Sequence, residues 1–150
     1  MEVNSQELIQ ILQNKITLFR HLGITVKEMT ADRVHFQVDL QRNLNHKGTA
    51  FGGSLYATAV LAAYGLVLAG LKEKNIPTEN IVIAKGAIDY LRPVETDFEI
   101  VCEFPDLPTK DQFYRDLVAN KRVRGSVKSH ILADGGSLKA LFEGSFVVRL

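Results

Sequence analysis

The sequence has little of several features that would indicate particular functions. It contains one cysteine, which excludes a disulfide framework within the chain. Its net charge of +1 gives no indication of a nucleic-acid or polyacidic partner. The sequence contains no Gly-x-Ser-x-Gly elbow, no His-Glu-x-x-His pair and no zinc-type Cys/His spacing, so it lacks these local signatures of serine hydrolases and zinc sites. The first residues lack the basic segment and apolar core of a signal peptide, so we expect a cytoplasmic protein.

The length of 150 residues fits one domain that buries roughly 70% of its unfolded surface. We therefore expect residues 1–150 to form a single domain. Leu8, Ile11, Leu12, Ile16 and Phe19 recur at helical spacing, which predicts an N-terminal helix over about 1–20 as a flank, ended by a glycine.

The central feature is a polar, glycine-containing loop, Asn45–Ser54, that leads into the uncharged run Phe51–Leu71. The run predicts a helix over about 51–72. A membrane span is the alternative, because the run is long enough to cross a bilayer. Its richness in small residues and the alternating segments on both sides favour a buried helix in a soluble domain.

Period-two alternation predicts strands. Residues 33–40 alternate and pair with 23–29 through a short hairpin, and further strands are expected at 81–91, 97–104, 120–133 and 137–150. Residues 109–119 are expected to be a short helix or irregular. Ala84 and Gly86 are expected to pack closely against the small residues of the long helix. Cys102 falls on an inner strand face, where a thiol is a small core residue and a poor nucleophile. The order predicts an α+β fold, with an antiparallel sheet wrapped around one long helix and its last four strands in a meander.

These elements resemble a known family. Three features together are similar to hotdog-fold thioesterases. They are the long helix, the strand ending Tyr90-Leu91-Arg92-Pro93, and the string Asn45-x-x-Gly48-Thr49-x-Phe51-Gly52-Gly53-Ser54-Leu55-Tyr56. The nearest resemblance is to the subfamily that follows an acetyltransferase-type domain in some relatives. It covers residues 20–150.

The resemblance implies a homodimer with active sites at the subunit interface, and leaves a dimer of dimers open. It implies an acyl thioester of coenzyme A or acyl carrier protein as the ligand, with coenzyme A or phosphopantetheine as part of the substrate rather than a cofactor. It implies neither a metal nor a Ser/His/Asp triad, in agreement with the motifs that the sequence lacks. Nucleic acid and membrane are not expected partners.

The sequence departs from the family pattern at two places. Phe51 stands where better-characterised hotdog thioesterases often have histidine before the Gly-Gly pair. The segment Ala57–Tyr64, where a helix carboxylate is usual, contains no Asp or Glu. Either another group activates water, or the protein binds thioesters without hydrolysing them well.

Candidate catalytic residues lie in and beside the loop. The backbone N–H of Gly53 or Ser54, at the start of the helix, suits a developing oxyanion, although Gly52-Gly53 could serve only as a tight helix entry. Asn45 could orient water or bond the thioester oxygen, or else stabilise the loop. Thr49 and Ser54 could hold water, and both are also ordinary helix-start residues.

Two side chains are candidates for the general base. His46 is next to the motif, and imidazole is the side-chain type suited to proton transfer at neutral pH, although a solvated loop histidine is the plainer interpretation. Asp89, near the end of a strand, could contribute from the same or the partner subunit, or it could simply be exposed.

Substrate contacts are expected from further residues. Phe51, Gly52 and Tyr56 belong to the family string and are expected to contact the substrate. Arg92, Arg122 and Arg124 could meet phosphates of coenzyme A or an acidic carrier protein, the alternative being a solvated strand face.

The sequence thus predicts an acyl-thioester hydrolase. A non-hydrolytic acyl-thioester binding or interaction protein on the same fold is the alternative, and a dehydratase is a weaker third hypothesis.

Overall fold

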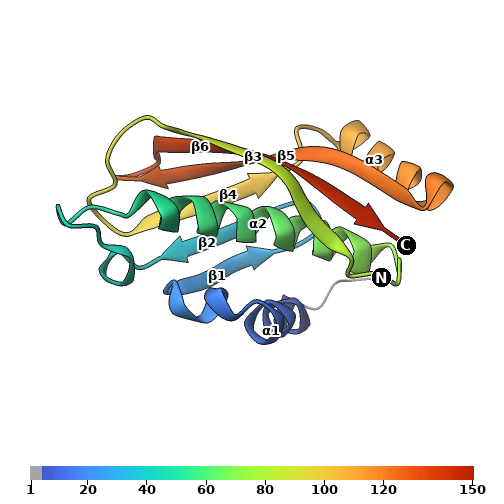
Figure 1. The fold of residues 1–150 in the computed structure, drawn as a ribbon, viewed down its shortest axis with the longest axis horizontal. Helices are drawn as coiled ribbons and strands as arrows, with labels where there is room; N and C mark the ends of the chain where they lie inside the picture. The colour runs from blue at the N-terminus through green and yellow to red at the C-terminus, as the bar shows by residue number, and fades with distance from the viewer. Residues whose placement is uncertain (1–4) are drawn as a thin grey trace.

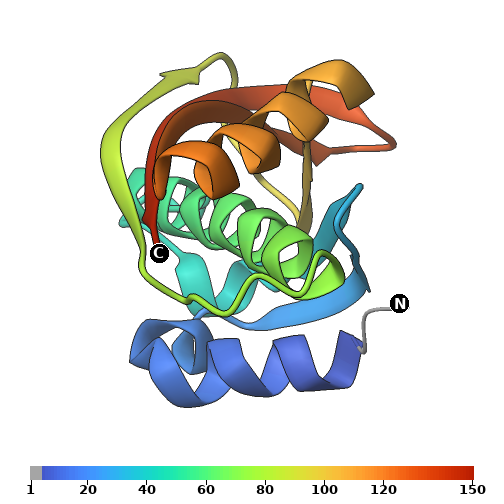
Figure 2. The same ribbon diagram turned by 90° about the vertical axis from the view of Figure 1, so that its right-hand side faces the viewer.

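The computed structural model describes residues 5–150, which form an antiparallel sheet curled around a central helix (Figures 1 and 2). Residues 1–4 of the expected N-terminal helix lie outside the described residues. The helical elements in chain order are α1 (Ser5–Lys15), the 3-10 helices η1 (Thr17–His21) and η2 (Leu40–Asn43), α2 (Gly52–Glu73) and α3 (Leu107–Asn120). The strands are β1 (Ile24–Met29), β2 (Val34–Val38), β3 (Ile81–Tyr90), β4 (Phe98–Glu103), β5 (Arg122–Ala133) and β6 (Ser137–Arg149). The expected α+β class is confirmed.

The strand order in the sheet is β1-β2-β4-β5-β6-β3. Strands β4, β5 and β6 form the expected meander. The prediction of four consecutive strands in a meander was wrong, because β3 pairs with β6 and not with β4. After β3 the chain crosses to β2, so β3 and β4 lie on opposite sides of α2 (Figure 2). Strands β1 and β3 are therefore the two edges of the sheet.

Helix α2 supplies the centre of the core. Thirteen of its 22 residues are buried, including Ala59, Ala62 and Ala63, whose small side chains let the sheet approach. Its length and apolar composition would suffice to cross a membrane, but most of that apolar stretch is buried inside the domain. A helix enclosed by its own sheet is the packing that the small-residue composition predicted.

The N-terminal segment is not one continuous helix. Helix α1 ends at Lys15, Ile16 is extended with φ −117°, and the chain continues as η1. The break lets Phe19 turn inward, where its ring contacts Phe36 edge-on at 6.0 Å. The apolar stripe still identified the buried side chains correctly, because Leu8, Leu12 and Phe19 are all in the core.

Helix α3 is a full helix where the sequence left the choice open. The Asp106 carboxylate caps it by accepting a hydrogen bond from the Thr109 N–H at 2.7 Å, and Pro108 lies in its first turn. That bond lowers the pKa of Asp106. An Asp cap followed by Pro is a helix-start signal, so these residues begin a helix as well as end the preceding strand.

Helix α3 is fixed to the rest of the domain by two buried polar side chains. The Tyr114 hydroxyl donates to the Val67 carbonyl of α2 at 3.2 Å. The Lys110 ammonium, on a side chain only 7% exposed, lies 2.7 Å from the Asp32 carboxylate and 3.7 Å from that of Glu73. One lysine therefore joins α3 to the β1–β2 hairpin and to the end of α2.

This lysine gives a stability prediction. Replacing Asp32 by Asn should lower the free energy of unfolding by about 1–2 kcal/mol, because the buried Lys110 ammonium then keeps only its longer contact with Glu73. The loss is smaller than for a fully buried pair because the Asp32 side chain is 68% exposed. Glu79→Gln is the matched control, since its partner Lys15 is 59% exposed and such pairs contribute less than about 1 kcal/mol. Urea denaturation measures both changes, and equal losses for the two variants would contradict the difference in burial.

Candidate active site

The loop before α2 is closed by hydrogen bonds that fix where the helix begins. Leu44 and Ala50 form an isolated antiparallel bridge, and the Phe51 N–H donates to the Asn43 carbonyl at 2.7 Å. The Asn43 side chain is 3% exposed, and its amide donates to the carbonyls of Leu22 and Asp39 at 2.8 and 2.7 Å. The loop and the first turn of α2 are thus tied to the residues just before β1 and just after β2.

Asn45 holds the tip of this loop. Its side-chain oxygen accepts from the N–H groups of Lys47 and Thr49 at 2.9 and 3.1 Å, and its amide donates to the Thr49 hydroxyl at 2.7 Å. Gly48 completes the turn with φ +80°. Both ends of the Asn45 amide, and the Thr49 hydroxyl, are therefore engaged in shaping the loop.

The N–H groups at the start of α2 divide into two kinds. The Ser54 N–H donates to the Phe51 carbonyl at 2.9 Å, so it is already satisfied. Within residues 5–150, the N–H groups of Gly52 and Gly53 have no hydrogen-bond acceptor. Of the two expected oxyanion donors, Gly53 is the one whose N–H makes no hydrogen bond. The Gly52 N–H, which was not expected as a donor, makes none either. Gly53 is exposed to solvent.

Two aromatic side chains lie beside these glycines. The Phe51 ring packs on Gly53 so closely that a Cβ there would lie 2.5 Å from the ring. The Tyr90 hydroxyl, from the end of β3, donates to the Gly52 carbonyl at 2.8 Å. Burial and the neighbouring Tyr56 raise the pKa of Tyr90, so its hydroxyl stays protonated at neutral pH. We call Phe51, Gly52, Gly53 and Tyr90 the helix-start corner.

The chemistry available at this corner follows from the helix start. First-turn N–H groups carry partial positive charge, and two of them here are free to receive an oxygen. The absence of side chains on Gly52 and Gly53 lets a planar carbonyl approach the backbone. The corner can therefore stabilise negative charge that develops on a carbonyl oxygen.

The two candidate bases lie outside the contacts of the corner. His46 is exposed in the loop tip. Asp89 is exposed in β3, and because strand residues alternate, it faces away from the side on which Tyr90 reaches Gly52. Arg92 is exposed just after β3, where its N–H donates to the Lys139 carbonyl.

The other two expected phosphate contacts lie elsewhere. Arg122 and Arg124 pair with Arg149 and Val147, whereas Tyr90 pairs with Ala140, which pairs in turn with Ile131. The seven residue-to-residue steps from Arg124 to Ile131 span roughly 23 Å of strand. Within one chain these arginines therefore do not come together with Arg92 or with the helix-start corner.

Cys102 is buried with no exposed surface, and burial raises the pKa of its thiol to about 12. The thiolate that a nucleophile needs is therefore almost absent at neutral pH. We predict that Ellman's reagent does not modify the native protein and reacts fully after unfolding in urea. Rapid reaction of the native protein would contradict the buried position.

An apolar groove runs beside the corner, where the sequence analysis expected close packing. Tyr56, Ala57 and Val60 of α2 face Ala84 and Gly86 of β3 across a cavity of about 430 Å³. Gly86 makes room for the Tyr56 hydroxyl, since a Cβ would lie 2.0 Å from that oxygen. The small residues were a correct signal, but they leave a groove rather than a close backbone contact.

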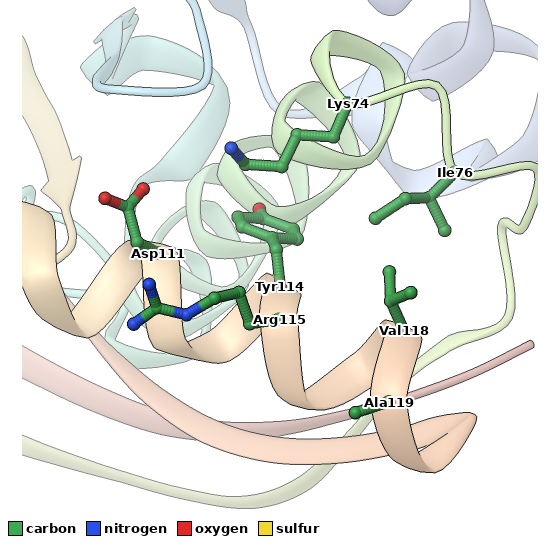
Figure 3. Close-up of a pocket in the computed structure, with 7 residues that line it drawn as sticks. All are labelled: Lys74, Ile76, Asp111, Tyr114, Arg115, Val118 and Ala119. Carbon is green, nitrogen blue, oxygen red and sulfur yellow. The ribbon is translucent and has the colours of Figure 1, made fainter.

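A second cavity lies at the opposite end of α2 (Figure 3). It measures about 690 Å³ and lies between the residues that follow α2 and helix α3. Lys74, Asp111 and Arg115 surround the Tyr114 ring on one side, and Ile76 and Val118 lie on the other. The C-terminal end of a helix offers carbonyls rather than free N–H groups, so this cavity lacks what the helix-start corner has.

Comparison with known proteins agrees with this architecture. Residues 5–150 match the family described as "Putative thioesterase (yiiD_Cterm)". A Chlorobaculum tepidum protein of unknown function is 27% identical, with a TM-score of 0.89 over 97% of this chain and 93% of that one. A Shewanella oneidensis protein described as a "putative thioesterase" is 24% identical, with a TM-score of 0.81 over 97% and 96%. A Pseudomonas aeruginosa protein described as "Probable Thioesterase" is 16% identical, with a TM-score of 0.83 over 99% and 97%.

The last two likenesses are below 25% identity and bear on the fold alone. The family match spans nearly the whole chain. The sheet curled around one long helix is the hotdog fold that the loop and strand motifs indicated, and this chain belongs to the thioesterase-like family that the match describes.

Proposed function

We propose that this protein hydrolyses acyl thioesters of coenzyme A or acyl carrier protein at the helix-start corner. The observation that supports this most is the pair of free N–H groups on Gly52 and Gly53 at the start of α2. A thioester carbonyl bound there gains stabilisation as its oxygen becomes negative during attack by water. Phe51 and Tyr90 form the two walls between which the carbonyl enters. A cytoplasmic location goes with this proposal.

Activation of the attacking water requires a general base, and among residues 5–150 no carboxylate or histidine side chain is hydrogen-bonded to the helix-start corner. The only carboxylate on α2 is Glu73, at the far end of the helix and 3.7 Å from the Lys110 ammonium. We therefore keep His46 and Asp89 as the candidate bases, with the partner subunit as a possible source of either. Asn45 and Thr49 act by holding the loop, and the Ser54 hydroxyl is available to position water.

Phosphate binding is proposed for Arg92, which follows β3 close to the corner. Arg122 and Arg124 could join it only from a second chain, given their distance from the corner along β5. A phosphopantetheine group would lead from the thioester toward this rim.

Thiol release from acyl-CoA and acyl carrier protein thioesters tests the hydrolase. We expect turnover by the wild-type protein and a loss of at least tenfold in kcat/KM for whichever of His46→Ala and Asp89→Asn removes the base. His130→Ala and Asp111→Asn are the matched controls, since both residues are exposed and neither contacts the corner. The absence of turnover with every acyl chain length, on both coenzyme A and acyl carrier protein, would contradict the proposal.

The absence of a carboxylate on α2 before Glu73 favours one alternative, an acyl-thioester binding protein that does not hydrolyse its ligand. In that case an acyl-CoA should raise the melting temperature without being consumed, because a ligand that binds the native state stabilises it. Consumption of the acyl-CoA in the same mixture would decide for the hydrolase.

A homodimer formed through β3 is the second part of the proposal. Among the strands of residues 5–150, β3 is hydrogen-bonded only to β6. Its free edge carries exposed apolar side chains, with Val82, Ile83 and Tyr90 54%, 39% and 53% exposed. Long apolar edges of this kind need cover, and pairing with a second copy provides it. The corner and the groove would then both border the interface.

Val82→Lys tests this interface. We expect sedimentation of the wild-type protein to show a dimer at micromolar concentration, and Val82→Lys to give monomer. Val118→Lys is the matched control, because Val118 is 59% exposed but lies on α3. A wild-type monomer, or dissociation by both substitutions alike, would contradict an interface at β3.

A further inference from the structure

The groove beside the helix-start corner offers a binding surface for an extended apolar chain. It lies between one stripe of α2, strand β3 and η1, and its walls include Tyr56, Val60, Tyr64, Ile83 and Leu18. Ile83 and Leu18 are 39% and 51% exposed, so much of this apolar surface is open in one chain. Tyr56 lies one helical turn after Gly53, which makes the groove continuous with the corner.

The composition of the groove indicates which part of an acyl thioester it can bind. Its lining is aliphatic and aromatic, with Lys85 as the one charged residue and no carboxylate. A pantetheine arm placed there would bury amide groups without partners, which costs free energy. An alkyl chain has no such groups and gains from burial. The groove therefore suits the acyl end of the substrate rather than the carrier end.

Polar groups lie at the far end of the groove. Tyr64 lines it there, half-buried, and burial followed by the charge of Glu79 raises the pKa of its hydroxyl. Glu79, in the connection before β3, accepts hydrogen bonds from the Lys15 ammonium of α1 at 3.0 and 3.1 Å. A longer alkyl chain would have to displace the Tyr64 ring and meet this ion pair.

The length of the path can be read from the helix. Gly53 and Tyr64 are separated by eleven residues, or roughly 16 Å of helix, and helical side chains lean toward the N-terminus, which shortens the usable path to roughly 11–16 Å. An extended alkyl chain advances roughly 1.3 Å per carbon, because its bonds of about 1.5 Å follow a zigzag. The path thus holds an acyl chain of about eight to twelve carbons.

We propose that the α2–β3 groove binds the acyl chain of the thioester, and that Tyr64 with the Lys15–Glu79 pair behind it limits the chain to medium length. This inference rests on the proposed function, because it takes the thioester carbonyl to lie at Gly52 and Gly53. Tyr64 acts as a specificity-determining residue and takes no part in the chemistry.

The test is a profile of kcat/KM for acyl-CoA substrates from butyryl to palmitoyl. The wild-type protein should show its highest kcat/KM within the range from octanoyl-CoA to lauroyl-CoA. Tyr64→Ala should raise the ratio of palmitoyl to octanoyl turnover at least tenfold, because it removes the end of the groove. Val60→Phe, which fills the middle, should shift the preference toward butyryl and hexanoyl.

Lys15→Ala is the variant least able to disturb folding, since Lys15 is exposed. It should shift the profile in the same direction as Tyr64→Ala but less. Leu107→Ala is a matched control, because Leu107 is 65% exposed on α3 and should leave the profile unchanged.

The outcomes separate this inference from the function on which it rests. If the wild-type protein hydrolyses none of these acyl chains, on coenzyme A or on acyl carrier protein, the proposed function fails. If it hydrolyses them and the folded Tyr64, Val60 and Lys15 variants keep the wild-type profile, the groove is not the acyl site. A wild-type optimum at palmitoyl would also overturn the proposed length limit.

Discussion

Gly53→Ala should reduce kcat/KM for thioester hydrolysis about 100-fold while leaving the protein folded. The new Cβ would lie 2.5 Å from Cε2 of the Phe51 ring, so the ring has to move off the start of α2. Because Phe51 is 57% exposed, it can swing into solvent at little cost in stability. The corner loses its shape, and a displacement of about 1 Å at a reacting centre can cost about this factor in rate.

A double substitution shows whether the clash with Phe51 is the cause. Phe51→Ala combined with Gly53→Ala removes the obstructing ring, so the double variant should be no worse than Phe51→Ala alone. Strict additivity of the two losses would mean that Gly53 acts independently of Phe51. Unchanged activity in Gly53→Ala would contradict the assignment of the oxyanion position to this corner.

Gly70→Ala should lower the free energy of unfolding by about 3 kcal/mol or more, the largest stability effect that we expect from a single added methyl group. A Cβ at position 70 would lie 1.8 Å from the Tyr114 hydroxyl oxygen. Tyr114 is only 2% exposed and its hydroxyl is bonded to the Val67 carbonyl, so the ring has no free space. Overpacking and the loss of a buried hydrogen bond add together.

Gly65→Ala is the matched control on the same helix. There the nearest atom to the added Cβ is the flexible methyl of Met29 at 3.1 Å. The gain of up to about 1 kcal/mol from replacing glycine within a helix offsets that mild contact, so the net change should be close to zero. Urea denaturation of both variants measures the difference, and similar stabilities would contradict the packing of α3 on α2.

The sequence predicted the parts of the fold whose pattern is local. Alternation identified the inner face of β4, because Phe98, Ile100 and Cys102 are all buried as expected. The uncharged run identified α2 to within two residues. The prediction that β3 continues the meander was wrong because pairing partners depend on how the sheet closes around α2, which no local pattern records.

The sequence located the start of α2 but not the contacts made there. The glycine pair and the uncharged helix located the corner. That Ser54 donates its N–H to Phe51, and that Tyr90 reaches Gly52 from another element, depend on tertiary geometry. Tyr90 was part of the recognised strand ending, but nothing in the sequence indicated which direction its hydroxyl faces. Asn43 carried no sequence signal beyond being an Asn near a loop.

The groove between α2 and β3 also depends on tertiary geometry that the sequence pattern did not indicate. Ala57, Ala84 and Gly86 were correctly expected to face one another, and small residues on facing elements usually indicate close approach. Here the Tyr56 ring enters the space beside Gly86 and packs edge-on against Phe142 at 5.3 Å. The bulge between Ile83 and Lys85 changes the register of β3 at the groove. An open groove is the result.

The most direct test of the central claim is thiol release by the purified wild-type protein from acyl-CoA substrates of increasing chain length. We predict turnover with an optimum among medium-length chains, octanoyl to lauroyl. A complete absence of thiol release across the series, with coenzyme A and with acyl carrier protein as the carrier, would contradict it.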